Sequence, residues 1–134
     1  MNIAQLIDVC AQQLEKAGVA FGHGTTNAHD EATWLVLWRL GLPLDSDLNA
    51  PEQQGKPALT MEQQVLVAAL MTERISSRKP AAYLTQEAWL QGVPFYVDER
   101  AIVPRSLIAE LLVDGSLDYW LSDQTHQVLD LCTG

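Results

Sequence analysis

The sequence predicts a mainly α-helical fold, in which a small N-terminal helical bundle is followed by a β-hairpin. Three stretches in the first 78 residues carry apolar side chains at helical spacing, and each follows a residue that can cap a helix. Two short apolar runs come next, separated by glycine and proline in the manner of a small hairpin. The 134 residues are 48% hydrophobic, which suffices for one packed domain and part of a second.

The bundle occupies residues 1–78 and contains three expected helices. Asn2, Asn27 and Thr60 each stand where a side chain can accept a hydrogen bond from the first helical turn. Thr60 and Gln63 together form a capping box. Each helix is then ended by a glycine or by a proline that follows basic residues at the C-terminal end of the helix. The expected helices run from Ile3 to Gly18, from Ala28 to Leu40 and from Met61 to Arg78.

Two loops join these helices. Phe21–Asn27, with the sequence FGHGTTN, contains a Gly-x-Gly but no preceding strand, third glycine or nearby lysine, so it is not a phosphate cradle. We interpret His23 within it as a turn residue rather than a metal ligand or a base. Leu44–Leu59 is polar and contains proline and glycine, so we expect a surface loop there, with a short helical turn near Pro51–Gln54.

Trp34 and Trp38 lie one helical turn apart in the second helix. Such a pair can form a stacking platform for a base or a ligand, but in an acidic helical domain it more often belongs to the core. The second half of this helix is nearly apolar, so we expect it to be the buried helix of the bundle.

Composition narrows the function. Eight Lys+Arg against 17 Asp+Glu give a net charge of −9, which argues against a nucleic-acid-binding surface. The negative charge either favours binding of a basic partner or serves solubility alone. No apolar run approaches the ~20 residues that cross a membrane, and no signal peptide is apparent, so we expect a cytoplasmic protein. Cys10 and Cys132 are too few and too far apart for a disulfide scaffold or a zinc site.

Residues 79–105 form the predicted hairpin linker. The two apolar runs are Trp89–Leu90 and Phe95–Val97. Gly92 and Pro94 separate them, and Gly92 supplies the backbone angles that a tight turn needs.

The rest of the chain alternates short apolar segments with turns. A capping serine precedes each of two short expected helices, Leu107–Val113 and Leu117–Leu121. A polar link, residues 122–127, leads to Val128–Cys132, which has the composition of a short strand.

Motifs in the linker and at the C-terminal end resemble those of one family. In order and spacing they are similar to the motifs of the S-adenosylmethionine-dependent protein glutamine methyltransferases (the HemK/PrmB family), over the whole chain. Pro104–Ser106, with Ile108 and Glu110 following, is more similar to the branch that acts on a large-subunit ribosomal protein than to the release-factor branch. The motifs that carry the resemblance are Lys79-Pro80-Ala81-Ala82-Tyr83-Leu84, Gly92, Phe95, Val97-Asp98, Val103-Pro104-Arg105 and Val128–Gly134.

The resemblance implies that residues 106–134 begin a truncated Rossmann-like methyltransferase domain, with Val128–Cys132 as its first strand. Cys132, Thr133 and Gly134 would begin the loop that binds S-adenosylmethionine. The family's Asn-Pro-Pro-Tyr motif is not among the 134 residues, so we expect this chain to be an inactive N-terminal portion. Its role would be to recognise a basic ribosomal protein. The alternatives are a release-factor glutamine methyltransferase and a non-enzymatic helical adaptor.

Arg105 admits two interpretations. It either lies beside the cofactor or substrate pocket, where a guanidinium would bind a carboxylate or carbonyl, or it is structural and pairs with Glu110 or Asp98.

The expected strand Val128–Cys132 has no partner within the chain, because its expected partner strands would lie beyond Gly134. It either frays together with residues 122–127, or it is covered by pairing with a second copy of the chain or by folding back along the hairpin, and we expect it to be covered.

Overall fold

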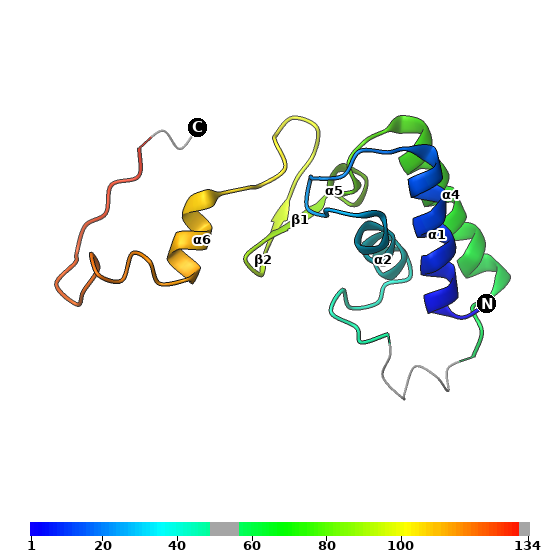
Figure 1. Ribbon diagram of the computed structural model, residues 1–134, viewed down its shortest axis with the longest axis horizontal. Helices are drawn as coiled ribbons and strands as arrows, with labels where there is room; N and C mark the ends of the chain where they lie inside the picture. Colours follow the sequence, from blue (N-terminus) through cyan, green and yellow to red (C-terminus); the bar gives the residue numbers. More distant parts are fainter. Residues whose placement is uncertain (49–56, 132–134) are drawn as a thin grey trace.

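The computed structural model describes residues 1–48 and 57–131, and its elements are arranged along one direction (Figure 1). The helices α1 (Ile3–Ala17), α2 (Ala28–Arg39) and α4 (Met61–Ser77) pack together at one end. The hairpin lies in the middle, and the chain from α6 (Leu107–Val113) onward runs away from the bundle. The expected bundle, hairpin and helix at 107–113 are therefore confirmed.

The caps expected at the bundle helices are present. The Oδ1 atom of Asn2 accepts a hydrogen bond from the backbone N–H of Gln5 at 2.8 Å, and the Gln5 side chain accepts one in return from the Asn2 N–H. Thr60 and Gln63 form the same reciprocal pair. Gly18 ends α1 in the left-handed conformation, at φ 59°. These termini could be located from sequence because each is specified by residues beside it.

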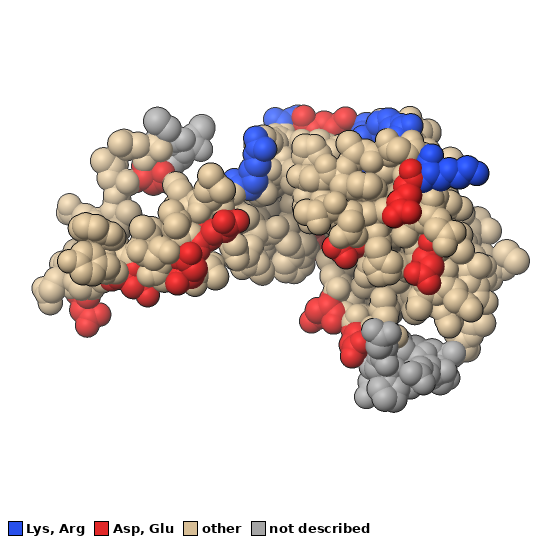
Figure 2. Space-filling view, viewed as in Figure 1, with Lys and Arg blue, Asp and Glu red and all other residues tan. Residues whose placement is uncertain are grey.

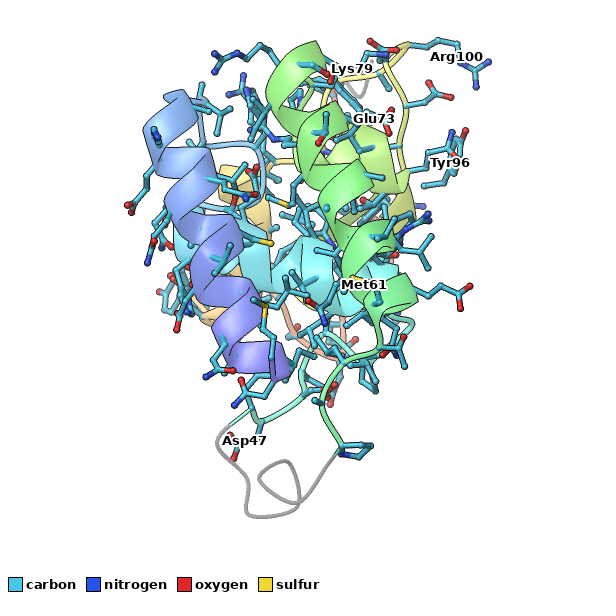
Figure 3. The ribbon with its side chains drawn as sticks, turned by 90° about the vertical axis from the view of Figure 1, so that its right-hand side faces the viewer. Asp47, Met61, Glu73, Lys79, Tyr96 and Arg100 are labelled. Atoms are coloured by element: carbon cyan, nitrogen blue, oxygen red, sulfur yellow. The ribbon has the colours of Figure 1, made fainter. Side chains whose placement is uncertain are left out.

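The bundle encloses the main core. In Figures 1 and 3, α1 and α4 lie side by side and α2 crosses them, so that α2 supplies the innermost side chains. Leu35, Val36 and Ala32 of α2 are fully shielded from solvent, as expected for the most apolar helix. The other buried members of this core are Leu6, Ile7, Cys10, Ala11, Leu14, Val19, Ala28, Val67, Leu70, Met71 and Ala81.

A short helix, α5 (Ala81–Thr85), begins the linker and is not expected from the sequence. The pattern around Pro80 indicates only a stop for the preceding helix, but proline also precedes helices well because its φ is already helical. In the structure Pro80 is the N-cap residue of α5. The Thr85 hydroxyl donates to the Ala81 carbonyl at 3.0 Å, and both residues are buried.

The hairpin pairs β1 (Glu87–Leu90) with β2 (Val93–Tyr96) in antiparallel register. Gln91 and Gly92 make the two-residue turn, with φ values of 49° and 77°. Two consecutive positive φ angles define the turn that best matches strand twist, which is why glycine is needed there. Pro94 lies inside β2, opposite Trp89, and does not separate the strands as expected. A two-stranded ribbon tolerates it because each strand has a free edge.

A second, smaller core fastens the hairpin to the bundle. It contains Ala82, Ala88, Val97 and Val103, and the partly buried Trp34 of α2 packs against both this core and the main one. Because both cores contact this one tryptophan, the hairpin is tied to the bundle through α2.

The C-terminal arm, residues 106–131, differs from the rest of the chain. Helix α6 forms where expected, with the Ser106 hydroxyl accepting from the Ala109 N–H at 3.1 Å, yet none of its residues is buried. The helix expected over Leu117–Leu121 is wrong, because the segment forms successive turns instead. A five-residue segment with no buried face has too little stabilisation to nucleate a helix.

The strand expected over Val128–Cys132 is wrong for its described part. Val128–Leu131 forms no strand, and Val128, Leu129 and Leu131 are 80%, 80% and 72% exposed. The segment does not fold back along the hairpin, whose sheet has two strands within the described residues. A strand forms only where a neighbour satisfies its backbone groups, and within the described residues no strand lies beside this segment. Cys132, Thr133, Gly134 and the turn expected near Pro51–Gln54 lie outside the described residues.

Two further findings concern membranes and metals. None of the helices within the described ranges is both long enough and apolar enough to span a bilayer. Within the same ranges, no group of three or more histidine, cysteine, aspartate or glutamate side chains is placed to hold a metal ion.

Candidate functional site

Two segments far apart in sequence meet beside the hairpin: the loop Phe21–Asn27 and the segment 102–105. The loop lies close to Trp34, because a Cβ added to Gly24 would come within 3.4 Å of the indole ring. Gly24 also has a φ of 107°, a conformation that side chains rarely adopt. Gly24, the second glycine of the Gly-x-Gly, thus lets the backbone pass over a tryptophan.

A buried ion pair holds this loop in place. The Nε atom of Arg74 lies 2.6 Å from Oε1 of Glu31, and both side chains are almost fully buried. Arg74 also donates from Nη2 to the Ala20 carbonyl at 2.8 Å, and the Thr25 hydroxyl donates to Oε2 of Glu31 at 3.0 Å. The two ends of the loop are therefore fixed to α2 and α4 through one charged centre.

Three adjoining cavities run along the junction. The smallest, about 40 Å³, is lined by His23, Pro104 and Arg105 among others. The next, about 180 Å³, shares Gly24, Val103 and Pro104 with it. The largest, about 790 Å³, shares Leu44 and Trp89 with the second. Neighbouring cavities share lining residues and therefore adjoin one another, and we call the three together the hairpin groove.

The hairpin groove has opposite charges at its two ends. Arg105 lies at the narrow end, whereas Asp45 and Glu87 line the wide end. Figure 2 shows a related separation over the visible face, where basic side chains gather along one edge of the helical part and the C-terminal arm presents acidic ones. A ligand that lies in the groove would therefore meet a cation at one end and carboxylates at the other.

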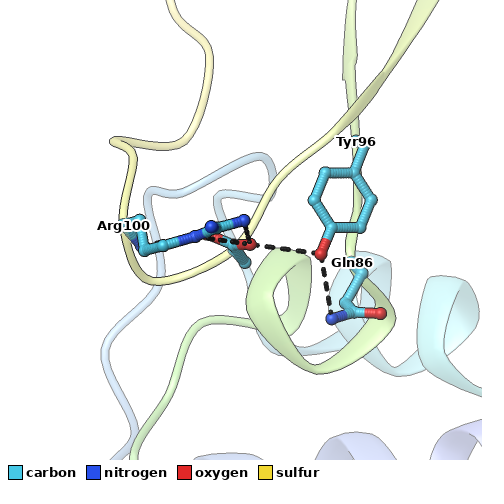
Figure 4. Close-up of polar contacts among 4 residues, drawn as sticks. Gln86, Tyr96 and Arg100 are labelled. Atoms are coloured by element: carbon cyan, nitrogen blue, oxygen red, sulfur yellow. Dashed lines mark hydrogen bonds and ion pairs between the residues drawn. The ribbon is translucent and has the colours of Figure 1, made fainter.

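Arg105 is exposed, and its side chain makes no ion pair or hydrogen bond within the described part of the chain. The structural pairing with Asp98 is wrong, because Arg100 holds that carboxylate instead, with Nη2 at 2.7 Å from Oδ2. Figure 4 shows that Tyr96 completes this arrangement, donating from its hydroxyl to Asp98 at 3.1 Å. Glu110 forms no ion pair with Arg105 in the described ranges either.

The arrangement around Asp98 has an electrostatic consequence. Hydrogen bonds from the Arg100 side chain and backbone hold the pKa of the Asp98 carboxyl well below its usual range. Asp98 is thus a carboxylate at neutral pH and is committed to the turn after β2. Because Asp98 is occupied, the Arg105 guanidinium is left available to the groove.

The tryptophan pair is less buried than expected. Trp34 and Trp38 are each partly exposed, and each lines a cavity of the hairpin groove while packing against the main core. The indole Nε1 of Trp34 is buried and has no hydrogen-bond partner among the described residues. The pair therefore packs against the core, as expected, and also lines the hairpin groove.

Sequence reasoning missed the third tryptophan of the groove and the carboxylate beside it. Trp89 and Glu87 stand two residues apart in β1, so they share one face of the hairpin. Indole Nε1 of Trp89 donates to Oε1 of Glu87 at 2.7 Å. The spacing could have indicated this pair, because residues two positions apart in a strand have their side chains on the same side of the sheet.

The chain is similar to curated proteins along nearly its whole length. It is 46% identical over 135 residues to a ribosomal protein uL3 glutamine methyltransferase of Neisseria gonorrhoeae, covering 99% of this chain and 44% of that protein. Identity to proteins of the same name is 45% in Burkholderia pseudomallei and 44% in Xanthomonas campestris, again over 99% of this chain. The chain spans less than half the length of these relatives. No protein-family model matches it.

Proposed function

The chain is a homologue of the ribosomal protein uL3 glutamine methyltransferases, and on that premise we propose that it is the substrate-recognition portion of such an enzyme. The observation that carries the proposal is the identity of about 45% across 99% of the chain. The enzyme that contains it would methylate the side-chain amide of a glutamine in uL3, with S-adenosylmethionine as methyl donor. Residues 1–78 would recognise the substrate, 79–105 would link, and 106–134 would begin the methyltransferase domain.

Methyl transfer to an amide nitrogen depends on positioning, because that nitrogen is a weak nucleophile. Binding energy from parts of the substrate remote from the glutamine can supply that positioning. The hairpin groove supports such a role, since it runs from the bundle to Arg105, directly before the arm that leads toward the proposed catalytic domain. When bound, S-adenosylmethionine supplies the methyl group, while the described residues of this chain would hold uL3.

Cys132, Thr133 and Gly134 would lie under the methionine part of the cofactor, and the free Arg105 guanidinium would face the cofactor or substrate pocket. We further propose that the 134-residue chain alone transfers no methyl group. The support for this is the absence of the Asn-Pro-Pro-Tyr motif from its sequence.

The experiment incubates uL3 with labelled S-adenosylmethionine and either the full-length protein or the 134-residue chain. Peptide mass spectrometry then locates any added methyl group. The expected result is one methylated glutamine with the full-length protein, and binding without methylation with the chain. A release factor serves as the parallel substrate. Methylation of the release factor alone would replace uL3 as the substrate, and methylation of neither would favour a helical adaptor.

A further inference from the structure

The widest part of the hairpin groove has a composition that the proposed function does not explain. This cavity, about 790 Å³, lies between β1 and the chain that follows α2. Trp38 and Trp89 line it together with apolar residues such as Pro43 and Leu44. No lysine or arginine is among its described lining residues. Its size is ample for a long side chain or a short segment of another protein.

Two carboxylates belong to this cavity. Oε1 of Glu87 accepts the hydrogen bond from the Trp89 indole, which holds the carboxylate beside the ring and leaves Oε2 without a partner among the described residues. Asp45 is exposed and makes no hydrogen bond or ion pair through its side chain in the described part of the chain. The cavity thus offers unpaired negative charge next to indole surface.

This combination selects one kind of ligand. An anion would be repelled by the two carboxylates, and a purely apolar group would cover them without pairing them, which costs free energy. A cation on an apolar stem satisfies both parts. Its stem would lie along the indoles and Pro43, its positive charge would be attracted to the ring faces, and its N–H groups would bind the carboxylates. Arginine fits best, because its planar fork donates to two carboxylate oxygens at once and stacks on aromatic rings.

We propose that this cavity receives an arginine side chain from the protein substrate. The inference rests on the proposed function for the identity of that substrate, but the chemistry of the cavity stands apart from it. A segment anchored there would extend past Trp34 toward Arg105, since the three cavities adjoin one another. The cavity would thus set the register in which the substrate approaches the catalytic domain.

The first test removes the two carboxylate charges of the cavity. Its effect on uL3 binding is compared with the effect of removing two exposed carboxylates elsewhere. In the double variant Asp45→Asn with Glu87→Gln, both side chains keep their shape, and the new amide oxygen at position 87 still accepts from the Trp89 indole. The control is Glu15→Gln with Glu73→Gln, which removes the same charge from exposed positions on α1 and α4, respectively, and Figure 3 labels Glu73. Calorimetry with purified uL3 should show about tenfold or greater weakening for the cavity variant and less than about threefold for the control.

The second test does not involve uL3. N-acetyl-arginine amide is titrated into the 134-residue chain while the indole N–H resonances are followed by NMR, with the uncharged citrulline analogue as comparison. The Trp38 and Trp89 resonances should shift with the arginine compound only, and Trp120, which lies on the arm and is 75% exposed, should not respond. The cavity variant should abolish these shifts.

The outcomes separate the two ideas. If uL3 binds, the two double variants weaken it equally, and the indole resonances do not respond to the arginine compound, the arginine site is overturned while the proposed function stands. If the arginine compound shifts Trp38 and Trp89 but uL3 does not bind, the site stands and uL3 is not its source. Equal shifts with the citrulline analogue would overturn the role of the positive charge.

Discussion

The bundle and the C-terminal arm contain similar kinds of helix with opposite surroundings. Helix α2 begins at the cap Asn27 and buries most of its apolar side chains, whereas α6 begins at the cap Ser106 and buries none. Leu35 in α2 is 0% exposed and Leu112 in α6 is 55% exposed. The cap and the apolar spacing are enough to form a helix in both places. What the arm lacks, within the described residues, is a surface to pack against.

The same contrast holds for charge. In the bundle, the Glu31–Arg74 pair is buried and joins a loop to two helices. The arm after Arg105 has no lysine or arginine, and its acidic residues are Glu110, Asp114, Asp118, Asp123 and Asp130. In the bundle, an ion pair stabilises the contacts between elements. The arm instead exposes acidic side chains, which form no ion pairs among the described residues, beside apolar ones. If this difference in packing is also a difference in energy, a substitution in the bundle should cost more stability than a matched substitution on the arm.

The largest effect is expected from Arg74→Met. The change leaves the Glu31 carboxylate buried with the Thr25 hydroxyl as its remaining partner in the described network, and breaking a buried pair in this way costs about 3–5 kcal/mol. The measurement is the free energy of unfolding in urea. The matched control is Arg100→Met, whose side chain is 85% exposed and whose loss should change little. Equal effects from the two variants would show that burial does not strengthen the pair.

A somewhat smaller effect is expected from core truncation. Leu35→Ala removes buried methyl groups and should lower the free energy of unfolding by about 2–5 kcal/mol. Leu112→Ala makes the same chemical change on the exposed arm and should stay within about 0.5 kcal/mol. Both are measured by urea unfolding. A cost above about 1 kcal/mol for Leu112→Ala would mean that the arm packs against the bundle in solution.

These two regions also explain what could be predicted from the sequence. Asn2, Asn27, Thr60 and Ser106 each fix a helix start through hydrogen bonds to residues three positions away, so those starts could be predicted correctly. Gly92 fixes the hairpin turn in the same local way. Local signals of this kind are complete in the sequence, because every atom involved lies within a few residues.

The errors concern features that depend on distant partners. Val128–Leu131 has the composition of a strand but lies beside no strand in the described structure. The prediction of a strand was therefore wrong, because it rested on composition alone. The hairpin groove is a second example, because Trp38, Trp89 and Arg105 come to line adjoining cavities only once the chain has folded. Arg105 could be selected from its motif, yet neither its free side chain nor the competition from Arg100 for Asp98 could be read from the sequence.

The helix caps give a third, smaller comparison. Asn27→Ala should cost about 1 kcal/mol of unfolding free energy, because α2 forms only together with the core. Ser106→Ala removes the same type of hydrogen bond from α6, which buries no residue, so it should reduce local helicity without shifting the unfolding midpoint. Thermal unfolding reports the first quantity, and NMR chemical shifts of residues 107–113 report the second. A lowered midpoint for Ser106→Ala would contradict the independence of the arm.

The smallest effect is expected at the boundary between the two regions, where Asp98 follows the hairpin. Its depressed pKa means that it stabilises the folded state when ionised. The contribution is therefore fully present above the ordinary aspartate pKa of about 4 and is lost as pH falls toward the lower pKa of the folded state. Asp114 in the arm also has a lowered pKa, caused by hydrogen bonds from Ser116, and serves as the matched control.

The measurement is the thermal midpoint of the wild type, Asp98→Asn and Asp114→Asn between pH 2 and pH 7. The wild type should exceed Asp98→Asn by a constant margin above about pH 5, and the margin should shrink below about pH 4, where the Asp98 carboxylate of the unfolded chain takes up a proton while that of the folded chain stays ionised. Asp114→Asn should match the wild type throughout, because the hydrogen bonds of Asp114 belong to a turn with no packed surroundings. A pH-dependent margin at Asp114 as well would place the arm inside the cooperative unit, since a lowered pKa affects the midpoint only where local structure unfolds together with the core.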